Sequence, residues 1–330
     1  MTLSYDVLIP AYQAEDSIAA AVASALAQRP RPERVLVYSD GSTDRTVERA
    51  RAAGAEVVDA TENRGVGHAR QTLLERSGAP WLLVLDSDDR LLPGAGRLFE
   101  EAVEEHPDAW VLGFGEVPDT SAVPRAATGL EPAVPVDLRS LWKRNPFVSS
   151  STLIRREPGV RVGGFPAVRR LVDYAFWLVL AAEPGARDRL WNRTCPVTVR
   201  AVHGGTITGN VVGAVMAERE LLVQHADAAL AGLAGPVRGA LTRARLGELW
   251  WRGLSRHVDY GRPASSYLSP GDVVPGVVLP AVLRVLALGS VQRGLRAAAR
   301  AARWARSGPH LDTQAWRRRT VRAPAGAPEG

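Results

Sequence analysis

The sequence predicts an α/β protein with a doubly wound, mixed but mostly parallel sheet flanked by helices, followed by a helical C-terminal appendage. Apolar runs that alternate with helical patterns at short spacing are typical of parallel strands joined by crossover helices. Right-handed crossovers place the loops after such strands along one edge of the sheet. We therefore expect the turns at 10–12, 40–43 and 86–89 to line one crevice. The apolar runs lie at residues 5–9, 35–38, 56–58, 81–85 and 109–114.

The helices between these strands are predicted from apolar periodicity and from glycines that end them. An amphipathic helix over 16–28 is indicated by Ile18, Val22 and Leu26, which recur at i, i+4 and i+8. A polar turn at 39–44 begins a second helix, which ends at a glycine. We expect a third helix between residues 67 and 78 and a fourth from 93 to about 105.

The pattern is less regular in the rest of the chain. Residues 117–135 are rich in Pro, Ala and Thr, so we expect a loop there. Later elements are expected as a helix at 138–144, a hydroxyl-rich strand at 147–154, a turn at 163–166, a helix at 171–182 and a strand at 197–202. Residues 212–306 have helical patterns. We therefore predict an α/β domain over 1–210, a helical region over 211–306 and a flexible basic tail over 307–330.

Composition excludes several classes of protein. The single cysteine among 330 residues, Cys195, excludes an internal disulfide framework and fits a reducing compartment. The N-terminus lacks the basic and apolar regions of a secretory signal, and no apolar stretch is long enough to span a membrane. We expect a cytoplasmic protein. Arginine crowds the C-terminal end, which can indicate nucleic acid, an anionic membrane or only a solvated tail.

Three carboxylates directly follow the apolar run at 81–85. Asp86, Asp88 and Asp89 would repel one another there, and burying them without a counter-charge costs several kcal/mol. The sequence therefore predicts a cation, and oxygen ligands favour Mg²⁺ or Mn²⁺ held by one or two carboxylates plus substrate phosphates. The alternative is a surface turn in which Asp89 caps the helix near Pro93.

Other motifs narrow the function further. The first strand is followed by no Gly-rich dinucleotide fingerprint, and the P-loop, zinc-site and nucleophile-elbow patterns are missing. Carboxylates at two strand ends together with Arg70 are suited to holding a diphosphate on a metal ion. Asp40 has an acceptor for a base N–H, and Tyr12 has a ring on which that base can stack. Alternatively, Asp40 is a turn-former, Tyr12 an aromatic at the rim of the core, and Arg70 an exposed helix charge.

Together these motifs resemble family 2 glycosyltransferases of GT-A fold. The resemblance rests on residues 7–12 (VLIPAY), 39–44 (SDGSTD), 63–65 (NRG) followed by Ala69-Arg70, and 85–89 (LDSDD). It continues with Gly163-Gly164-Phe165 and Asp173-Tyr174, and more loosely with His203. It covers roughly residues 4–210, which makes residues 1–210 a GT-A catalytic domain by this resemblance.

The resemblance implies roles for individual residues. Pro10, Tyr12 and Asp40 would hold the nucleotide base. Arg70 would lie against the base or its diphosphate, with Asp86 at the ribose or metal and Ser87 beside it. Asp88 would ligate Mn²⁺ or Mg²⁺ as the second carboxylate of a D-x-D signature, and His203 would be a metal or phosphate ligand. Asp173 would be the catalytic base.

The chain departs from the family pattern at two places. The family usually has Glu-Asp where this chain has Val172-Asp173, which indicates a different contact with the acceptor. The family often has an arginine two residues before the late histidine. Here Ala201 occupies that position and Arg200 lies one place earlier.

The expected activity is an inverting transfer of a sugar from a UDP, dTDP or GDP sugar to an acceptor hydroxyl. The acceptor would be a glycan, a lipid-linked molecule or a small molecule, and no nucleic acid is expected. The alternatives are a sugar nucleotidyltransferase and a non-catalytic sugar-nucleotide binder. Residues 273–306 are expected either to rest on the inner face of an anionic membrane or to pack on the catalytic domain with a solvated arginine face.

Overall fold

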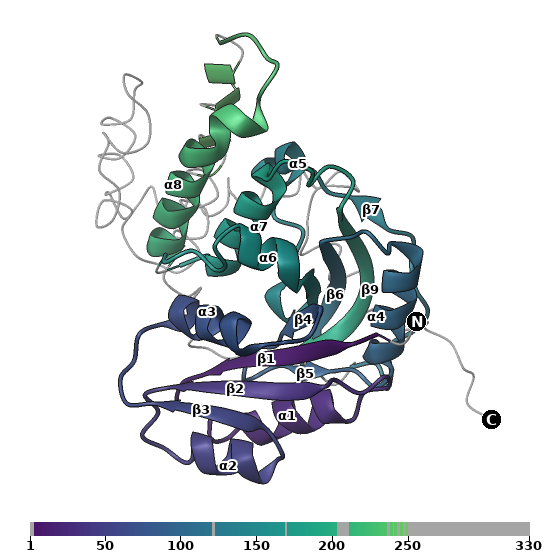
Figure 1. Cartoon of the computed structure of the whole chain (residues 1–330). Coiled ribbons are helices and arrows are strands. Elements are labelled where there is room, and N and C mark those ends of the chain that lie inside the picture. Colours follow the sequence, from purple (N-terminus) through teal and green to yellow (C-terminus); the bar gives the residue numbers. More distant parts are fainter. Residues whose placement is uncertain are drawn as a thin grey trace, which may run out of the picture. The chain divides into compact units, whose positions relative to one another are not determined.

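The computed structural model describes residues 3–120, 123–168, 170–202 and 211–235, with scattered positions between 238 and 249 (Figure 1). The chain divides into two compact units, Met1–Thr206 with Glu220–Arg238, and Ile207–Arg219 with Gly239–Gly330. The α/β fold lies in the first unit. His203, the stretch 273–306 and the tail 307–330 lie outside the described residues, and the division at 210 and 306 stays a prediction.

A single mixed sheet forms the centre of the first unit. Its strand order is β3-β2-β1-β4-β8-β6-β9-β5, and β7 pairs with β9 beside this path. The strands are β1 (Tyr5–Ala11), β2 (Arg34–Asp40), β3 (Glu56–Ala60), β4 (Trp81–Val84), β5 (Arg90–Leu91), β6 (Val111–Pro118), β7 (Val134–Pro135), β8 (Thr152–Arg155) and β9 (Leu190–Arg200).

The first four long strands are parallel, as the sequence predicts. β1 pairs in parallel with β2 and with β4, and β2 pairs in parallel with β3. On the far side of β4 the direction reverses, because β8 is antiparallel to both β4 and β6. β6 and β9 return to the first direction, while β5 and β7 run antiparallel to β9. The predicted mixed, mostly parallel sheet is confirmed.

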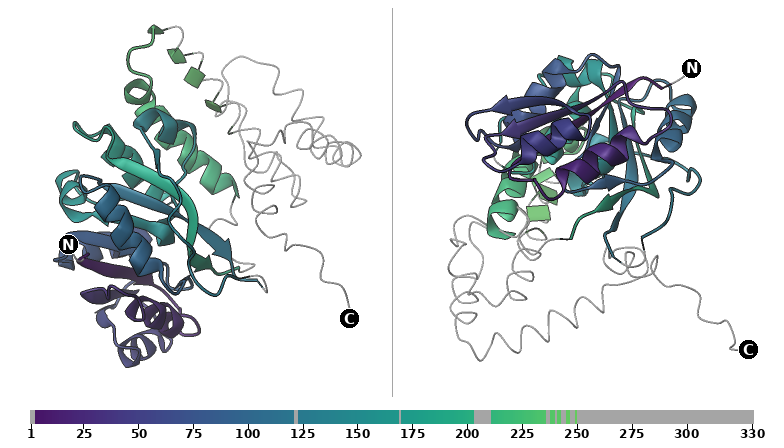
Figure 2. Two further views of the ribbon diagram at one scale, coloured as in Figure 1. Left: turned by 90° about the vertical axis from the view of Figure 1, so that its right-hand side faces the viewer. Right: turned by 90° about the horizontal axis from the view of Figure 1, so that it is seen from below.

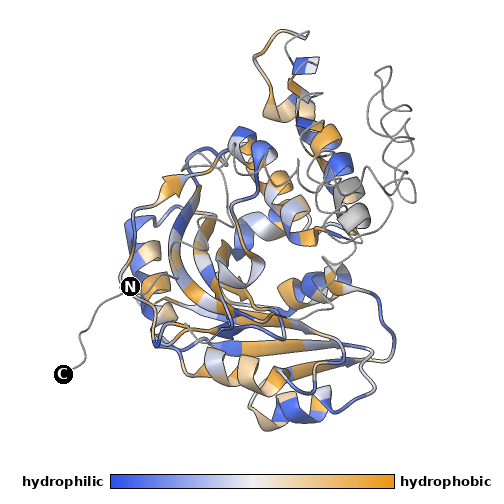
Figure 3. Ribbon diagram, turned by 180° about the vertical axis from the view of Figure 1, so that it is seen from behind, coloured by the Kyte–Doolittle hydropathy of each residue, from blue (hydrophilic) through white to orange (hydrophobic). Residues whose placement is uncertain are grey.

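Helices cover both faces of the sheet (Figures 1 and 2). The described helices of the whole chain are α1 (Ile18–Leu26), α2 (Thr46–Ala52), α3 (Val66–Arg76), α4 (Ala95–Glu105), α5 (Leu138–Lys143), α6 (Arg156–Arg161), α7 (Val172–Ala182) and α8 (Val211–Ala229), of which α8 belongs in part to the second unit. Side chains alternate between the faces of a strand, so β1 packs against different helices on its two sides. Tyr5, Val7 and Ile9 share a buried cluster with residues of α1 and α4. Hydropathy colouring shows hydrophobic residues concentrated along the central strands (Figure 3).

Some predicted elements differ from the structure. The expected strand at 147–154 is wrong in its first half, where Ser149–Ser151 form a short 3-10 turn and only then does β8 begin. The last strand of the α/β unit is longer than predicted, since β9 begins at Leu190. The short elements α6, β5 and β7 carry too few residues to show a period and were not predicted. No helix among the described residues is long and apolar enough to cross a membrane.

Candidate functional site

The carboxyl ends of β1, β2 and β4 meet at one edge of the sheet. In the parallel register, Ala11 is paired with Ser39, and Leu8 is paired with Val84. Pro10 is buried in β1, one residue before the strand ends, and Asp86 follows two residues after Val84. The expected convergence of the three turns is therefore confirmed. In open α/β sheets this edge is where ligands bind.

A buried arginine contacts one of the strand-end carboxylates. The Nη2 atom of Arg70, on α3, donates to Oδ1 of Asp86 at 2.8 Å. The side chain of Arg70 is only 7% exposed, whereas that of Asp86 is 40% exposed. The alternative interpretation of Arg70 as an exposed helix charge is therefore wrong. Its Nε atom is also buried and has no hydrogen-bond partner within the described part of the chain, so the guanidinium retains unused capacity to donate.

Asp40 binds the loop that precedes α3. Its Oδ1 accepts from the amide of Arg64 at 2.8 Å, and its Oδ2 accepts from the amide of Gly65 at 2.7 Å. The residue is buried, at 4% exposure. Asp40 thus has a structural role, in stabilising the loop at 63–65, besides any role in binding. Each carboxylate oxygen has further lone pairs, so this role is compatible with accepting from a base.

Gly41 allows the same loop to approach the end of β2. Its φ of +71° is favourable for glycine, and an added Cβ would lie 2.7 Å from the amide nitrogen of Asn63 and from the carbonyl carbon of Glu62. Asp40 therefore binds the loop, and Gly41 leaves room for it because it has no side chain. Both residues belong to the SDGSTD run, but no sequence pattern indicates that the glycine serves this contact.

Tyr12 projects from the edge of the sheet. Its side chain is 54% exposed, so the ring is accessible from solvent and is not part of the buried core. Gln13 follows in the left-handed region at φ 49°. The side-chain Oε1 of Gln13 accepts from the backbone amide of Thr43 at 2.8 Å, and the backbone amide of Gln13 donates to Ser42 Oγ at 3.1 Å. These bonds fix the turn that carries Tyr12 to the turn after β2.

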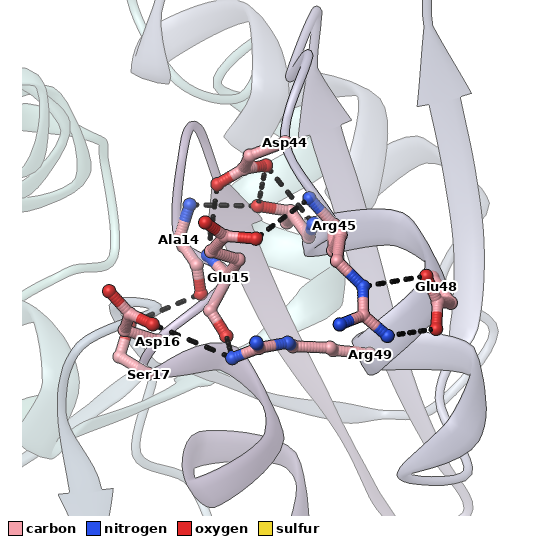
Figure 4. Close-up of polar contacts among 9 residues, drawn as sticks. Ala14, Glu15, Asp16, Ser17, Asp44, Arg45, Glu48 and Arg49 are labelled. Carbon is pink, nitrogen blue, oxygen red and sulfur yellow. Dashed lines mark hydrogen bonds and ion pairs between the residues drawn. The ribbon is translucent and has the colours of Figure 1, made fainter.

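A second set of contacts joins the same two turns one residue further along (Figure 4). Asp44 accepts from the amide of Glu15 at 3.1 Å, and Thr46 Oγ1 accepts from the amide of Ala14 at 2.8 Å. Asp44 also accepts from both the amide and the hydroxyl of Thr46. Burial tends to raise the pKa of the Asp44 carboxyl, but these hydrogen bonds lower it overall below its ordinary 3.8.

The three carboxylates of the acidic turn have different environments. Asp89 is buried at 4% exposure, and its Oδ1 accepts from the amide of Ala201 at 3.0 Å. Burial is the main reason why the pKa of Asp89 is raised to about 7; the charge of Asp86 acts in the same direction, and a hydrogen bond with Ser150 acts against it. α4 begins after Gly94, so the interpretation of Asp89 as its cap is wrong. Asp86 and Asp88 are half-buried, as is Ser87 between them.

This donor set fits a hard divalent ion shared with phosphate oxygens. Asp89 turns inward, which leaves Asp86 and Asp88 as the carboxylates at the surface of the turn. No group of three or more His, Cys, Asp or Glu side chains suited to a metal occurs in the described ranges. Mg²⁺ and related ions commonly take one or two carboxylates and complete their shell with substrate oxygens and water.

Asp173 lies in the first turn of α7 and is half-buried. Leu171, just before the helix, has φ 55°. Its neighbour Val172 is 2% exposed, and a Cβ added to Gly67 of α3 would lie 3.5 Å from a methyl group of Val172. The residue that replaces the family's usual acid is therefore an apolar contact between α3 and α7. α3 thus carries Arg70 and also supports the start of the helix that carries Asp173.

A family model described as glycosyl transferase family 2 matches residues 6–173, just over half of the 330 residues. The chain belongs to glycosyl transferase family 2. The matched segment begins in β1 and ends at Asp173, so it contains every predicted site residue except His203. The family resemblance that the sequence motifs indicate is confirmed.

Two curated relatives resemble shorter stretches of this glycosyl transferase family 2 chain. Succinoglycan biosynthesis protein ExoU of Rhizobium meliloti is 45% identical over 101 residues, which are 29% of this chain and 29% of that protein. An uncharacterized glycosyltransferase of Haemophilus influenzae is 26% identical over 185 residues, which are 54% of this chain and 62% of the relative. The matches thus span less than two thirds of the length of either relative.

Solved structures share the fold at lower identity. S. aureus TarS 1–349 in complex with UDP is 19% identical, with a TM-score of 0.57 over 91% of this chain and 87% of that chain. Mannosyltransferase PcManGT from Pyrobaculum calidifontis in complex with GDP-Man and Mn²⁺ is 21% identical, with a TM-score of 0.53 over 89% of this chain and 83% of that chain. These likenesses confirm the predicted GT-A-type fold.

The close approach at Gly41 generates a stability prediction. Gly41→Ala introduces strain at a positive φ, about 1–3 kcal/mol, and also displaces the backbone at Glu62 and Asn63. Gly94→Ala is the matched control, because Gly94 also has a positive φ of +87°, while an added Cβ there would meet only the carbonyl oxygen of Ala127, at an ordinary 3.9 Å. Urea unfolding should show a larger loss of unfolding free energy for Gly41→Ala than for Gly94→Ala. The Gly94→Ala loss measures the strain of a positive φ without the close contact. Equal losses would mean that the contact with the loop contributes nothing.

The lowered pKa of Asp44 generates a pH prediction. A carboxyl whose folded pKa lies below its unfolded value stabilises the fold above that value, and this stability is lost as the pH falls through the folded pKa. Asp44→Asn should therefore reduce the unfolding free energy at neutral pH, and its difference from wild type should shrink below pH 3.8. Urea unfolding across this pH range measures the difference.

Asp59→Asn, on an exposed position of β3, is the control for that measurement and should follow wild type at every pH. An Asp44→Asn curve parallel to that of wild type down to the most acid pH would contradict a role for the Asp44 charge.

Proposed function

We propose that this protein is an inverting glycosyltransferase that moves a sugar from a nucleotide-diphosphate sugar to an acceptor hydroxyl. The observation that carries the proposal is the contact between buried Arg70 and half-exposed Asp86 at the edge where β1, β2 and β4 end. A fixed guanidinium beside carboxylates that can hold a divalent ion suits a diphosphate. Membership of glycosyl transferase family 2 supports the reaction class.

The nucleotide would lie across the ends of β1 and β2. Exposed Tyr12 offers a ring for stacking, Pro10 forms the floor beside it, and Asp40 offers acceptors to the base. Uracil, thymine and guanine each present an N–H to such an acceptor, so we propose a UDP, dTDP or GDP donor. The TarS and PcManGT structures, which hold UDP and GDP-Man respectively, support this range of donors.

The acidic turn would hold Mn²⁺ or Mg²⁺ beside the diphosphate. We assign the metal to Asp88, with Asp86 and Ser87 at the ribose or the ion, and His203 as a further metal or phosphate ligand. An ion bound there would neutralise the negative charge that grows on the departing diphosphate. Arg70 would donate to the same diphosphate, or to the base, from its buried position on α3.

Asp173 would act as the general base. Its carboxylate would take the proton from the acceptor hydroxyl as the oxygen attacks the anomeric carbon. The new C–O bond forms on the face opposite the diphosphate, and the bond between the anomeric carbon and the diphosphate oxygen breaks, so the configuration inverts. Because Val172 is packed against α3, the acceptor would meet Asp173 without a second acid beside it.

Thermal unfolding with UDP, dTDP and GDP, each with and without Mn²⁺, tests the donor site. A ligand at a hundred times its dissociation constant adds roughly 2.7 kcal/mol to the unfolding free energy. Wild type should gain stability with one nucleotide in a Mn²⁺-dependent manner, and Asp88→Asn should lose that gain. Asp173→Asn should keep the gain, while release of nucleotide from the sugar donor falls by about 10²–10⁴-fold.

The outcomes separate the proposal from its alternatives. Transfer by Asp173→Asn at the wild-type rate would remove Asp173 as the base. Binding without transfer in wild type would favour a non-catalytic sugar-nucleotide binder, and reaction with a nucleoside triphosphate would favour a nucleotidyltransferase. No response to any nucleotide would overturn the donor site altogether.

We also propose that residues 273–306 touch an anionic membrane surface, where lipid-linked acceptors reside. The support is in the sequence, because Arg293, Arg296, Arg300 and Arg303 recur at helical spacing. The full chain should float with vesicles that contain anionic lipid, and replacing the four arginines by glutamine should abolish this. A wild-type chain that stays out of the vesicle fraction would instead favour a helix packed on the protein.

A further inference from the structure

The hydroxyl-rich turn at 149–151 lies directly against the acidic turn. β8 is antiparallel to β4, so the residues that precede β8 are at the edge where β4 ends. The amide of Asp86 donates to Ser150 Oγ at 3.1 Å. The Ser150 hydroxyl also hydrogen-bonds to the carboxylate of Asp89. One buried hydroxyl therefore joins the first and last residues of the turn at 86–89.

Further hydrogen bonds stabilise the acidic turn and the 149–151 turn. Within the acidic turn, the amide of Asp89 donates to the carbonyl of Asp86 at 3.0 Å. The Thr198 hydroxyl, on β9, donates to the carbonyl of Ser150 at 2.6 Å. The amide of Ala201 donates to Asp89. The acidic turn, the 149–151 turn and the end of β9 thus form one hydrogen-bonded unit.

We propose that Ser150 is a positioning residue that fixes the shape of the acidic turn and thereby the placement of the carboxylate of Asp88. Its hydroxyl accepts from the amide at one end of the turn and donates to the carboxylate at the other, so its donor and one acceptor position are both used. Ser150 is only 1% exposed, so its hydroxyl acts through the turn and not by direct contact with a substrate. Residues that orient metal ligands in this way typically change metal affinity by 10–100-fold when they are removed.

The neighbouring serine provides a matched control. Ser151 belongs to the same turn and is completely buried, but its hydroxyl has no hydrogen-bond partner within the described residues. Ser151→Ala therefore removes a buried hydroxyl from the same turn without breaking a bond to the acidic turn. Any difference between Ser150→Ala and Ser151→Ala reports the two bonds that only Ser150 makes.

The test measures Mn²⁺ binding directly, by titration of the protein with Mn²⁺ in the presence of the nucleotide that stabilises wild type. Ser150→Ala should bind Mn²⁺ about tenfold or more weakly, while its affinity for the nucleotide without metal stays at the wild-type value. Ser151→Ala should match wild type in both. Equal Mn²⁺ affinity in Ser150→Ala and wild type, or equal weakening in the two serine variants, would overturn the proposal.

A second variant covers the case in which Ser150→Ala does not fold. Thr198→Val then replaces it, because this nearly isosteric change removes the hydroxyl that donates a hydrogen bond to the Ser150 carbonyl. It should weaken Mn²⁺ binding in the same direction, and wild-type affinity would overturn the proposal. The inference rests on the proposed function, so failure of wild type to bind Mn²⁺ with any nucleotide would overturn both. Unchanged binding in the variants overturns only the role of Ser150.

Discussion

The pair of Arg70 and Asp86 is the interaction on which the site depends. An arginine buried to 7% exposure loses most of its hydration, and such a charge is tolerated only with a partner of opposite sign. Asp86 can be that partner because β4 ends beside β1, and α3 packs against β1 and β2. The parallel register, the placement of α3 and the acidic turn are therefore mutually required. A shift in any of them would leave a buried guanidinium unpaired.

Helix α3 connects the two halves of the proposed reaction site. Its N-terminal loop is held by Asp40, and Arg70 follows one turn into the helix. The helix also packs against the second half of the chain, where Gln71 accepts from the amide of Phe165 at 2.8 Å and Gly67 faces Val172. The residues that we assign to the sugar donor and the helix of Asp173 are thus both supported by α3, one rigid element. This arrangement suits a reaction that requires two substrates to be held in fixed geometry.

The sequence predicted the parallel half of the fold because its strands are buried on both faces and alternate regularly with helices. It also predicted that Asp40, Arg70 and Asp86 lie near one another, since strand ends of one direction share an edge. It could not show which of the three carboxylates turns inward, because Asp89 is distinguished by contacts with Ser150 and Ala201, both distant in the sequence. It misassigned residues 147–151, the first part of the predicted strand at 147–154, for a similar reason. A hydroxyl-rich run with apolar flanks has the pattern of a strand, and its contact with Asp86 depends on tertiary structure.

Because β8 runs antiparallel to β4, one part of the site comes from the second half of the sheet. Asp86 and Ser150 are 64 positions apart in the chain, so the acidic turn is completed by a segment that is synthesised much later. The first four parallel strands contain the pieces that we assign to the base and diphosphate, but they do not contain the hydroxyl that closes the turn. A fragment limited to those strands would lack the Ser150 hydroxyl, and with it the complete turn to which we assign the metal. The first four strands therefore do not form the complete site on their own. The site is complete only after the second half of the sheet has packed against them through long-range contacts.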